Sequence, residues 1–298
     1  MQTLASLGPT TISRCNRYSL ASRNVDQTFL IDVAMPAAPL APGQAVPVVY
    51  VLDGNVMFAM AAQAARMMQS GGDPLPPFLI VGVGYQYRRG GGPNWEYVGL
   101  RCRDYSPTSD PWMMAALRAS PPPYGVPEDF QLGGAAAFLA FFNEELKPFI
   151  AANYAVEAGD QTPLGFSLGG LFALNTLFTA PGSFNRYIAG SPALAWDGRV
   201  MFDREAALAA TAKDLSADLF LSVGGLEEDE DGGASTARVS NLAAMEAALR
   251  GRRYPSLRMT HHVFPDETHF SVMAATISRG IRTVFARPSD ARTAAPDA

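Results

Sequence analysis

The segment G-F-S-L-G, residues Gly165–Gly169, decides the fold because it joins a predicted strand to a predicted helix. It matches G-x-S-x-G, in which the serine occupies a strained, sharp strand-to-helix turn. The glycines two residues before and two residues after the serine are expected to press against neighbouring backbone, so that only a hydrogen atom fits there. The helix that begins at Leu168 would aim its positive end and free N–H groups at the same place. The motif therefore predicts Ser167 as a nucleophile.

Strands and helices alternate on both sides of this motif. Short apolar, β-branched runs bounded by Pro or Gly are typical of buried strands, and they predict strands at Thr28–Ala34, Pro47–Leu52, Phe78–Val83, Thr162–Phe166, Tyr187–Ala189, Leu219–Val223 and Leu257–Phe264. Apolar residues at helical spacing predict helices at Phe58–Gln69, Gly134–Ile150, Leu168–Phe178, Thr236–Arg250 and Phe270–Phe285. The alternation predicts a mainly parallel central sheet with helices on both faces, and together with the G-x-S-x-G turn it predicts an α/β-hydrolase fold.

The length and composition favour one large core. The chain has 298 residues, of which 48% are hydrophobic and 17% are charged. We expect an N-terminal extension over residues 1–14, a single α/β-hydrolase domain over 15–285 and a disordered tail over 286–298, which is polar and rich in Ala and Pro. Within the domain, residues 84–130 lose regularity and predict a long, irregular, cap-like insertion near the active site.

Several classes of protein are disfavoured. The net charge of −5 offers no basic surface for nucleic acid or an anionic membrane. The longest apolar stretches, such as Gly134–Phe142, are shorter than the ~18 residues that span a bilayer. Residues Met1–Ser19 carry no signal-peptide pattern, so a cytoplasmic location is expected. Cys15 and Cys102 favour two unrelated thiols over one disulfide, and neither metal nor cofactor is expected. The sequence does not indicate an oligomeric state.

A nucleophilic serine needs a base, and the chain has three histidines. His261 and His262 lie inside a predicted strand, where they would point to opposite faces and serve structural roles. His269 follows that strand, in the loop before the last helix. Reactive groups of this fold lie on loops at the carboxyl ends of strands. We therefore predict His269 as the base.

The third member of a triad should be an acid between the serine and the histidine in chain order. An acidic run follows the predicted strand Leu219–Val223, and such runs are usually solvated turns. Glu227 is the first acid to leave the strand and is the preferred candidate, with Glu228 and Asp229 left open.

An oxyanion hole needs two backbone N–H groups directed at the developing charge. Leu168, the residue after the nucleophile, would supply one of them. Asn55, which follows the end of an early predicted strand, would supply the other, with Gly54 allowing the turn. Asp53 at the same strand end is expected to brace the loop by hydrogen bonds, with a role as general acid as the less favoured alternative.

Arginines and aromatic residues gather in the insertion. Together they suit a flat, anionic or phenolic group through stacking and paired hydrogen bonds. The candidate substrate contacts are Arg88, Trp95, Arg101, Arg103 and Tyr105. In the alternative, the aromatic residues only pack the segment, and Arg101 and Arg103 pin it to the body of the domain.

Seven segments together resemble the Putative esterase family, the esterase D-like branch of the α/β-hydrolases. They are V-V-Y-V-L-D-G-N (Val48–Asn55), L-I-V-G-V-G-Y (Leu79–Tyr85), R-C-R-D-Y-S-P-T (Arg101–Thr108), G-G-A-A-A-F-L-A-F-F-N-E-E-L-K-P (Gly133–Pro148), G-F-S-L-G-G (Gly165–Gly170), S-V-G-G-L-E (Ser222–Glu227) and D-E-T-H (Asp266–His269). R-x-R-D-Y-[ST]-P together with D-G-N is most similar to the branch that contains trilactone siderophore esterases. The resemblance implies the same five roles, for Ser167, His269, Glu227, Leu168 and Asn55.

The expected activity is hydrolysis of a small-molecule carboxylic ester through an acyl-enzyme on Ser167. Aryl, phenolic or catecholate siderophore-type esters suit the residues of the insertion. The alternatives are a broad esterase for short acyl or feruloyl-type esters, acyl transfer to an alcohol, and a catalytically inactive hydrolase-fold binding protein.

Overall fold

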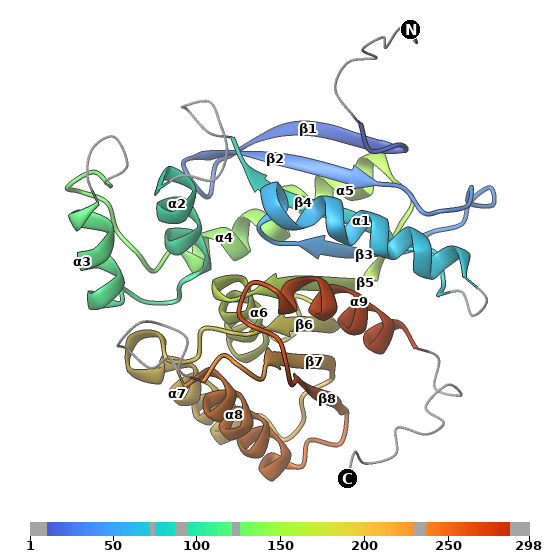
Figure 1. The fold of residues 1–298 in the computed structure, drawn as a ribbon. Helices are drawn as coiled ribbons and strands as arrows, with labels where there is room; N and C mark the ends of the chain where they lie inside the picture. The colour runs from blue at the N-terminus through green and yellow to red at the C-terminus, as the bar shows by residue number, and fades with distance from the viewer. Residues whose placement is uncertain (1–10, 72–74, 87–94, 121–125, 229–236, 287–298) are drawn as a thin grey trace, which may run out of the picture.

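An eight-stranded sheet runs through the molecule in the order β1-β2-β4-β3-β5-β6-β7-β8 (Figure 1). The computed structural model describes residues 11–71, 75–86, 95–120, 126–228 and 237–286. The strands are β1 (Cys15–Ser22), β2 (Gln27–Ala34), β3 (Val46–Val51), β4 (Leu79–Tyr85), β5 (Val156–Phe166), β6 (Arg186–Gly190), β7 (Ala217–Gly224) and β8 (Leu257–Phe264). β1 pairs antiparallel with β2 and β2 with β4, and the other neighbours are parallel. The predicted mainly parallel α/β sheet is confirmed.

Helices cover both faces of the sheet. They are α1 (Gly54–Ser70), α2 (Trp95–Tyr105), α3 (Pro111–Ala119), α4 (Ala135–Phe141), the π-helix η1 (Phe142–Leu146), α5 (Lys147–Asn153), α6 (Leu168–Thr179), α7 (Trp196–Thr211), α8 (Arg238–Arg252) and α9 (Val272–Phe285). α1 and α9 lie over one face (Figure 1), where their apolar side chains join one core cluster. α2, α4, α6 and α8 contribute to a second cluster on the other face.

Strand β3 shows how the two clusters are divided. Val48 and Tyr50 belong to the cluster with α4 and α6, whereas Val49 and Val51 belong to the cluster with α1 and α9. Successive side chains of a strand point to opposite faces, so a strand covered on both sides is apolar at every position. This is why the run Val46–Val51 is buried throughout.

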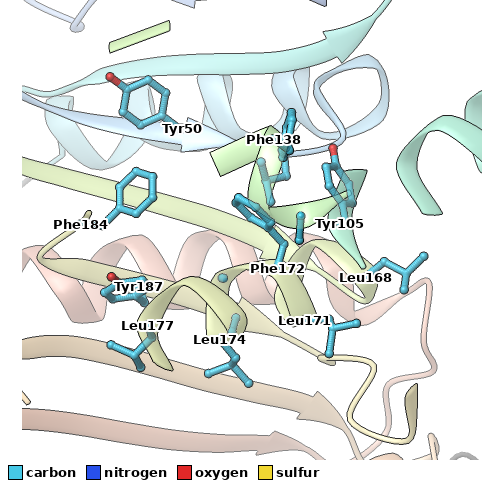
Figure 2. Close-up of a cluster of buried hydrophobic side chains, with 14 of the residues drawn as sticks. Tyr50, Tyr105, Phe138, Leu168, Leu171, Phe172, Leu174, Leu177, Phe184 and Tyr187 are labelled. Carbon is cyan, nitrogen blue, oxygen red and sulfur yellow. The ribbon is translucent and has the colours of Figure 1, made fainter. Parts of the chain in front are cut away.

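Helix α6, which follows Ser167, is enclosed by the core. It is buried from Leu168 to Phe178, as expected for a helix that is apolar all round. Figure 2 shows Phe172 of this helix packed with Phe138 of α4 and Tyr105 of α2; the Phe172 ring lies 5.1 Å from the Phe138 ring and 6.1 Å from the Tyr105 ring, centroid to centroid. The helix that carries the elbow is therefore held rigidly.

The insertion over residues 84–130 is more regular than predicted. It contains α2 and α3, which the sequence analysis missed. Tyr97, Arg101 and Tyr105 are four residues apart, so they lie on one face of α2, and both tyrosines are buried. This spacing was a usable helix signal, hidden by the charges between the tyrosines. Helix α3 is capped at its N-terminus by Asp110, whose carboxylate accepts a hydrogen bond from Met113 N at 2.7 Å.

Of the remaining predictions, some are confirmed, some are wrong and some lie outside the described residues. β1 and α7 were not predicted, and the predicted helix Gly134–Ile150 is present but divided by the π-helical turn η1. Cys15 and Cys102 are both free, as expected. Within the described ranges, no helix is long and apolar enough to cross a membrane. The expected tail beyond Ala286 and the first ten residues of the expected extension lie outside the described residues.

Candidate active site

The predicted elbow lies between β5 and α6. Ser167 has φ 59° and ψ −115°, a strained positive-φ conformation that an L-residue adopts only when its surroundings enforce it. Its N–H donates to Gly190 O at 2.9 Å, and its carbonyl accepts from Leu171 N at 3.0 Å and Ala193 N at 3.2 Å. The neighbouring strand β6 and the helix α6 thus fix the turn, as the motif predicted.

The steric role of the two motif glycines is confirmed for one and wrong for the other. A side chain at Gly165 would collide with the backbone of Gly169. At Gly169 itself, a Cβ would lie 3.4 Å from Leu52, which is an ordinary contact. Gly170 is the more restricted of the two helix glycines, because its Cβ would lie 2.9 Å from Gly190 O. The first turn of α6 therefore presses on Gly165, and β6 presses on Gly170.

The structure brings Glu227 and His269 together. Glu227 Oε2 lies 2.6 Å from His269 Nδ1. The other carboxylate oxygen accepts hydrogen bonds from Ser191 Oγ and Gly224 N, both at 2.6 Å, and the side chain is fully buried. Glu228, one of the two open alternatives, instead accepts from Ser240 N at 3.0 Å. The other alternative, Asp229, lies outside the described residues.

Two loops at the carboxyl ends of β7 and β8 deliver this pair. Gly225 N donates to Phe264 O at 2.7 Å, and Leu226 N donates to Glu267 O at 3.1 Å, so the two loops are bonded directly to each other. A side chain at Gly224 would collide with Glu267 O, and one at Gly225 would collide with the backbone of Pro265. The Gly-Gly sequence before the acid therefore allows the two loops to approach.

The environment favours a charged Glu227. Burial alone raises the pKa of this carboxyl, but the hydrogen bonds from His269, Ser191 and Gly224 outweigh burial and hold the pKa below its ordinary value. Arg238 adds a positive charge, with Nε 3.8 Å from Glu227 Oε2. An ionised carboxylate at this position can orient an imidazole and stabilise its protonated form.

The imidazole of His269 lies beside the elbow. Its ring centroid is 4.9 Å from the ring of Phe166, the residue immediately before Ser167. The other two histidines lie within β8, as predicted, and His261 Nδ1 is 2.7 Å from Glu246 Oε2 of α8. The geometry therefore favours His269 over His261 as the partner of the elbow serine.

The two candidate oxyanion donors belong to the first turns of two helices. Leu168 begins α6, and Asn55 is the second residue of α1. N–H groups in the first turn of a helix have no partner within that helix, so they can bind an anion. The Asn55 side chain is held in place by Tyr85, whose N–H donates to Oδ1 at 2.7 Å and whose carbonyl accepts from Nδ2 at 3.0 Å.

Asp53 braces the loop before Asn55, as expected. Its carboxylate accepts two hydrogen bonds from Arg101, from Nε and Nη2, each at 2.8 Å. The Tyr97 hydroxyl donates to the same carboxylate at 2.6 Å. The Asp53 N–H donates to the Tyr105 hydroxyl at 2.9 Å.

These contacts overturn part of the expected substrate surface. Tyr105 is fully buried among the rings of Figure 2, so its assignment as a substrate contact is wrong. Arg101 is bound to Asp53, and Arg103 is bound to Asp104 through Nε at 2.6 Å and Nη2 at 3.1 Å. Both arginines fit the alternative, in which they pin the segment to the domain. The side chains of Arg88 and Trp95 lie outside the described parts of the chain.

Three residues at the site were missed from sequence. Ser191 follows β6 and binds the candidate acid, and it could have been found because adjacent parallel strands end at the same edge of the sheet. Leu226 and Phe270 directly flank the acid and the base in sequence, and they are 54% and 80% exposed. The Phe270 ring lies 5.3 Å from the His269 ring. Exposed apolar side chains beside such a pair suit contact with an apolar substrate group.

Comparison with known proteins agrees with the resemblance found in the sequence. The family model described as Putative esterase matches residues 126–269. The chain is 30% identical over 267 residues to ferri-bacillibactin esterase BesA of Bacillus subtilis, covering 88% of this chain and 86% of that protein.

Solved structures extend this similarity to three dimensions. The BES protein from Bacillus cereus is 28% identical, with a TM-score of 0.77 over 95% of this chain and 99% of that chain. An IroE-like serine hydrolase from Shewanella oneidensis is 26% identical, with a TM-score of 0.75 over 91% of this chain and 80% of that chain. The chain therefore belongs to the Putative esterase family of α/β-hydrolases, in the branch of the siderophore esterases, and is an esterase related to serine hydrolases.

Proposed function

We propose that this esterase works through an acyl-enzyme on Ser167. Ser167 Oγ attacks the ester carbonyl carbon, while His269 Nε2 accepts the hydroxyl proton and Glu227 stabilises the resulting imidazolium through Nδ1. The N–H groups of Leu168 and Asn55 stabilise the oxyanion of the tetrahedral intermediate. The intermediate collapses and expels the alcohol, which takes the proton from His269.

The second half of the reaction releases the acid. Water attacks the acyl-enzyme carbonyl and gives a proton to His269, and the tetrahedral intermediate then collapses to the carboxylic acid. His269 returns its proton to Ser167 Oγ, so the enzyme is regenerated. No group beyond the chain and water takes part in this cycle.

One observation carries the mechanism: the 2.6 Å hydrogen bond between buried Glu227 and His269, whose ring lies 4.9 Å from Phe166 beside the elbow. A base oriented by a buried carboxylate and lying next to a strained serine is the arrangement that nucleophilic acyl transfer requires.

Two serine variants test this mechanism. Ser167 lies at the elbow with a positive φ of 59°. Ser240 lies on α8, where its hydroxyl donates to Glu228, outside the proposed triad. Ser167→Ala should lower kcat for an aryl ester by about 10⁴-fold or more, because the nucleophile is lost. Ser240→Ala, the control, should keep most of the activity. Comparable activity of Ser167→Ala and the wild-type protein would refute the proposal.

We further propose that the substrate is an ester with a flat aromatic group, such as a catecholate siderophore ester. The relative BesA is described as a ferri-bacillibactin esterase, and the similarity spans most of both chains. In this chain, Phe270 is 80% exposed with its ring 5.3 Å from that of His269, so it can stack on a planar group at the reacting centre. Phe270 thus supports an aromatic substrate in place of Arg101, Arg103 and Tyr105, whose side chains face inward.

A substrate panel tests this second step separately. The kcat/KM values for a catecholate trilactone, with and without ferric ion, are compared with those for p-nitrophenyl acetate, p-nitrophenyl butyrate and a feruloyl ester. The proposal predicts the largest kcat/KM for the trilactone. A preference for short acyl chains without trilactone turnover would instead identify a broad short-chain esterase. Ser167→Ala is the control for background hydrolysis.

A further inference from the structure

Asp53 has an uncommon backbone conformation, and hydrogen bonds hold both its backbone and its side chain. Its φ of 52° and ψ of 43° lie in the left-handed region, immediately before Gly54 and Asn55. Its carbonyl accepts hydrogen bonds from Val56 N and Met57 N, each at 2.9 Å, which fixes the first turn of α1. The direction of the Asn55 N–H therefore depends on how Asp53 is held.

The side chain of Asp53 is held by α2. Arg101 binds both carboxylate oxygens at 2.8 Å, and the Tyr97 hydroxyl binds one of them at 2.6 Å. The guanidinium carbon of Arg101 lies 5.8 Å from the centre of the Tyr97 ring and 5.6 Å from that of the Tyr105 ring. A two-point contact of this kind fixes orientation as well as charge, which a lysine does not do.

The carboxylate of Asp53 is also close to the elbow helix. A Cβ on Gly169 would lie 3.7 Å from Asp53 Oδ2, which places this oxygen against the turn of α6 that begins with Leu168. The side chains of Asp53 and Arg101 are 5% and 16% exposed, so water screens their charges weakly. Without Arg101, the carboxylate would repel the oxyanion that forms between Leu168 and Asn55.

We propose that Arg101 is a positioning residue for the oxyanion hole, where it neutralises Asp53 and orients the loop that carries the Asn55 N–H. The proposal rests on the function proposed above for Asn55 and Leu168. Arg101 belongs to the insertion and lies far from Asp53 in sequence. The insertion therefore completes a site whose other residues lie at the ends of strands.

The test compares an aryl butyrate with its thiono analogue, in which sulfur replaces the carbonyl oxygen. Sulfur is a weak hydrogen-bond acceptor, so the two N–H groups favour the oxygen ester. The ratio of the two kcat/KM values therefore reports the oxyanion hole. A smaller fraction of active protein lowers both values equally and leaves the ratio unchanged. This separates positioning from a merely structural role.

Arg101→Met should lower kcat for the oxygen ester by about 10- to 100-fold, with KM within about twofold, and should reduce the oxygen-to-thiono ratio by about tenfold. Arg252→Met is the matched control. Arg252 binds buried Glu205 through two hydrogen bonds of 2.8 Å, with the same geometry, on α8. Its removal should lower stability and leave the ratio at the wild-type value.

An unchanged ratio in Arg101→Met would overturn the proposal. If that variant does not fold, Arg101→Lys decides by the same ratio, because it keeps the charge and loses the two-point contact. The wild-type ratio separates this inference from the proposed function. A wild-type protein that does not discriminate between the two esters contradicts the oxyanion role of Asn55 and Leu168, whereas discrimination that survives in the Arg101 variants contradicts only the role of Arg101.

Discussion

Two buried carboxylates flank the elbow, and they differ in their partners. Glu227 follows β7 and Asp53 follows β3, and each accepts several hydrogen bonds below the protein surface. Glu227 is bonded to His269, whose imidazole has one nitrogen that can accept a proton and one that can donate it. Asp53 is bonded to Arg101, which stays protonated at all relevant pH values. The first pair can serve proton transfer, and the second can serve only charge balance and geometry.

The two carboxylates also differ in what supports them. The Glu227 loop is bonded to the neighbouring loop after β8, so consecutive strand–helix units build the proposed acid–base side. The Asp53 loop is bonded to α2, which belongs to the insertion. The proposed oxyanion side therefore depends on a segment outside the repeating βα pattern, and variation in that segment can alter the site without touching the acid–base pair.

The largest expected difference between the two carboxylates is in kcat. Glu227→Gln should lower kcat by about 10³- to 10⁴-fold, because an amide stabilises neither the required tautomer nor the imidazolium. Asp53→Asn, the matched amide variant, should lower kcat by only about tenfold, since geometry and not proton transfer is affected. Steady-state kinetics at saturating ester measure both. Equal losses would remove the distinction drawn between the two carboxylates.

The next largest expected effect is on the free energy of unfolding. Here the variant on the Asp53 side should lose more than the variant on the Glu227 side. Arg101→Met should lower the free energy of unfolding by about 3–5 kcal/mol, because Asp53 is left buried without a counter-charge. His269→Gln should lower it by less, since Glu227 keeps its bonds from Ser191 and Gly224. Urea unfolding followed by circular dichroism compares them. A larger loss in the histidine variant would contradict this ranking.

Ser191 gives a smaller effect on the acid side. Ser191→Ala removes one of the hydrogen bonds to buried Glu227 and should lower the free energy of unfolding by about 1–3 kcal/mol. Ser240→Ala is the control, because the hydrogen bond that its hydroxyl donates to Glu228 is exposed to solvent. The control should change stability by less than about 0.5 kcal/mol. Similar losses in both variants would show that burial does not strengthen the bond at Ser191.

The smallest expected effect is in the pH dependence of stability. The pKa of Glu227 is lower in the folded protein than in the unfolded chain, because the hydrogen bonds from His269, Ser191 and Gly224 outweigh burial. The folded state therefore gains stability from this carboxylate above the unfolded pKa and loses it as the pH falls through the lower folded pKa. Unfolding temperatures measured between pH 7 and pH 3 should fall less steeply in Glu227→Gln. An equal slope in both proteins would mean that this carboxyl is not stabilised by folding.

Sequence reasoning predicts the acid–base side better than the oxyanion side, for a physical reason. Ser167, Glu227 and His269 each follow a recognisable strand, and the carboxyl ends of parallel strands meet at one edge of the sheet. Chain order and strand ends therefore suffice to bring them together. Glu227 was preferred over Glu228 and Asp229 only because it is the first acid after the strand. The bonding between the two loops decides which carboxylate turns inward, and this bonding could not be predicted from sequence.

The role proposed for α2 could not be predicted from chain order and strand ends. Arg101 and Tyr105 were interpreted as substrate contacts, because arginine beside aromatic residues is typical of binding surfaces. Whether such a face points outward or inward depends on Asp53, a partner far away in sequence. The room for a side chain at Gly169 could not be predicted from sequence either, because it depends on the position of Leu52.

The most direct test of the central claim is covalent labelling of Ser167. Folded protein is incubated with a fluorophosphonate, digested and analysed by peptide mass spectrometry, with His269→Ala and Glu227→Gln treated in parallel. We predict a single phosphonyl group on the peptide that contains Ser167, formed much more slowly in the two variants. An unmodified Ser167 in folded wild-type protein, or an equal rate of labelling in all three proteins, would contradict it.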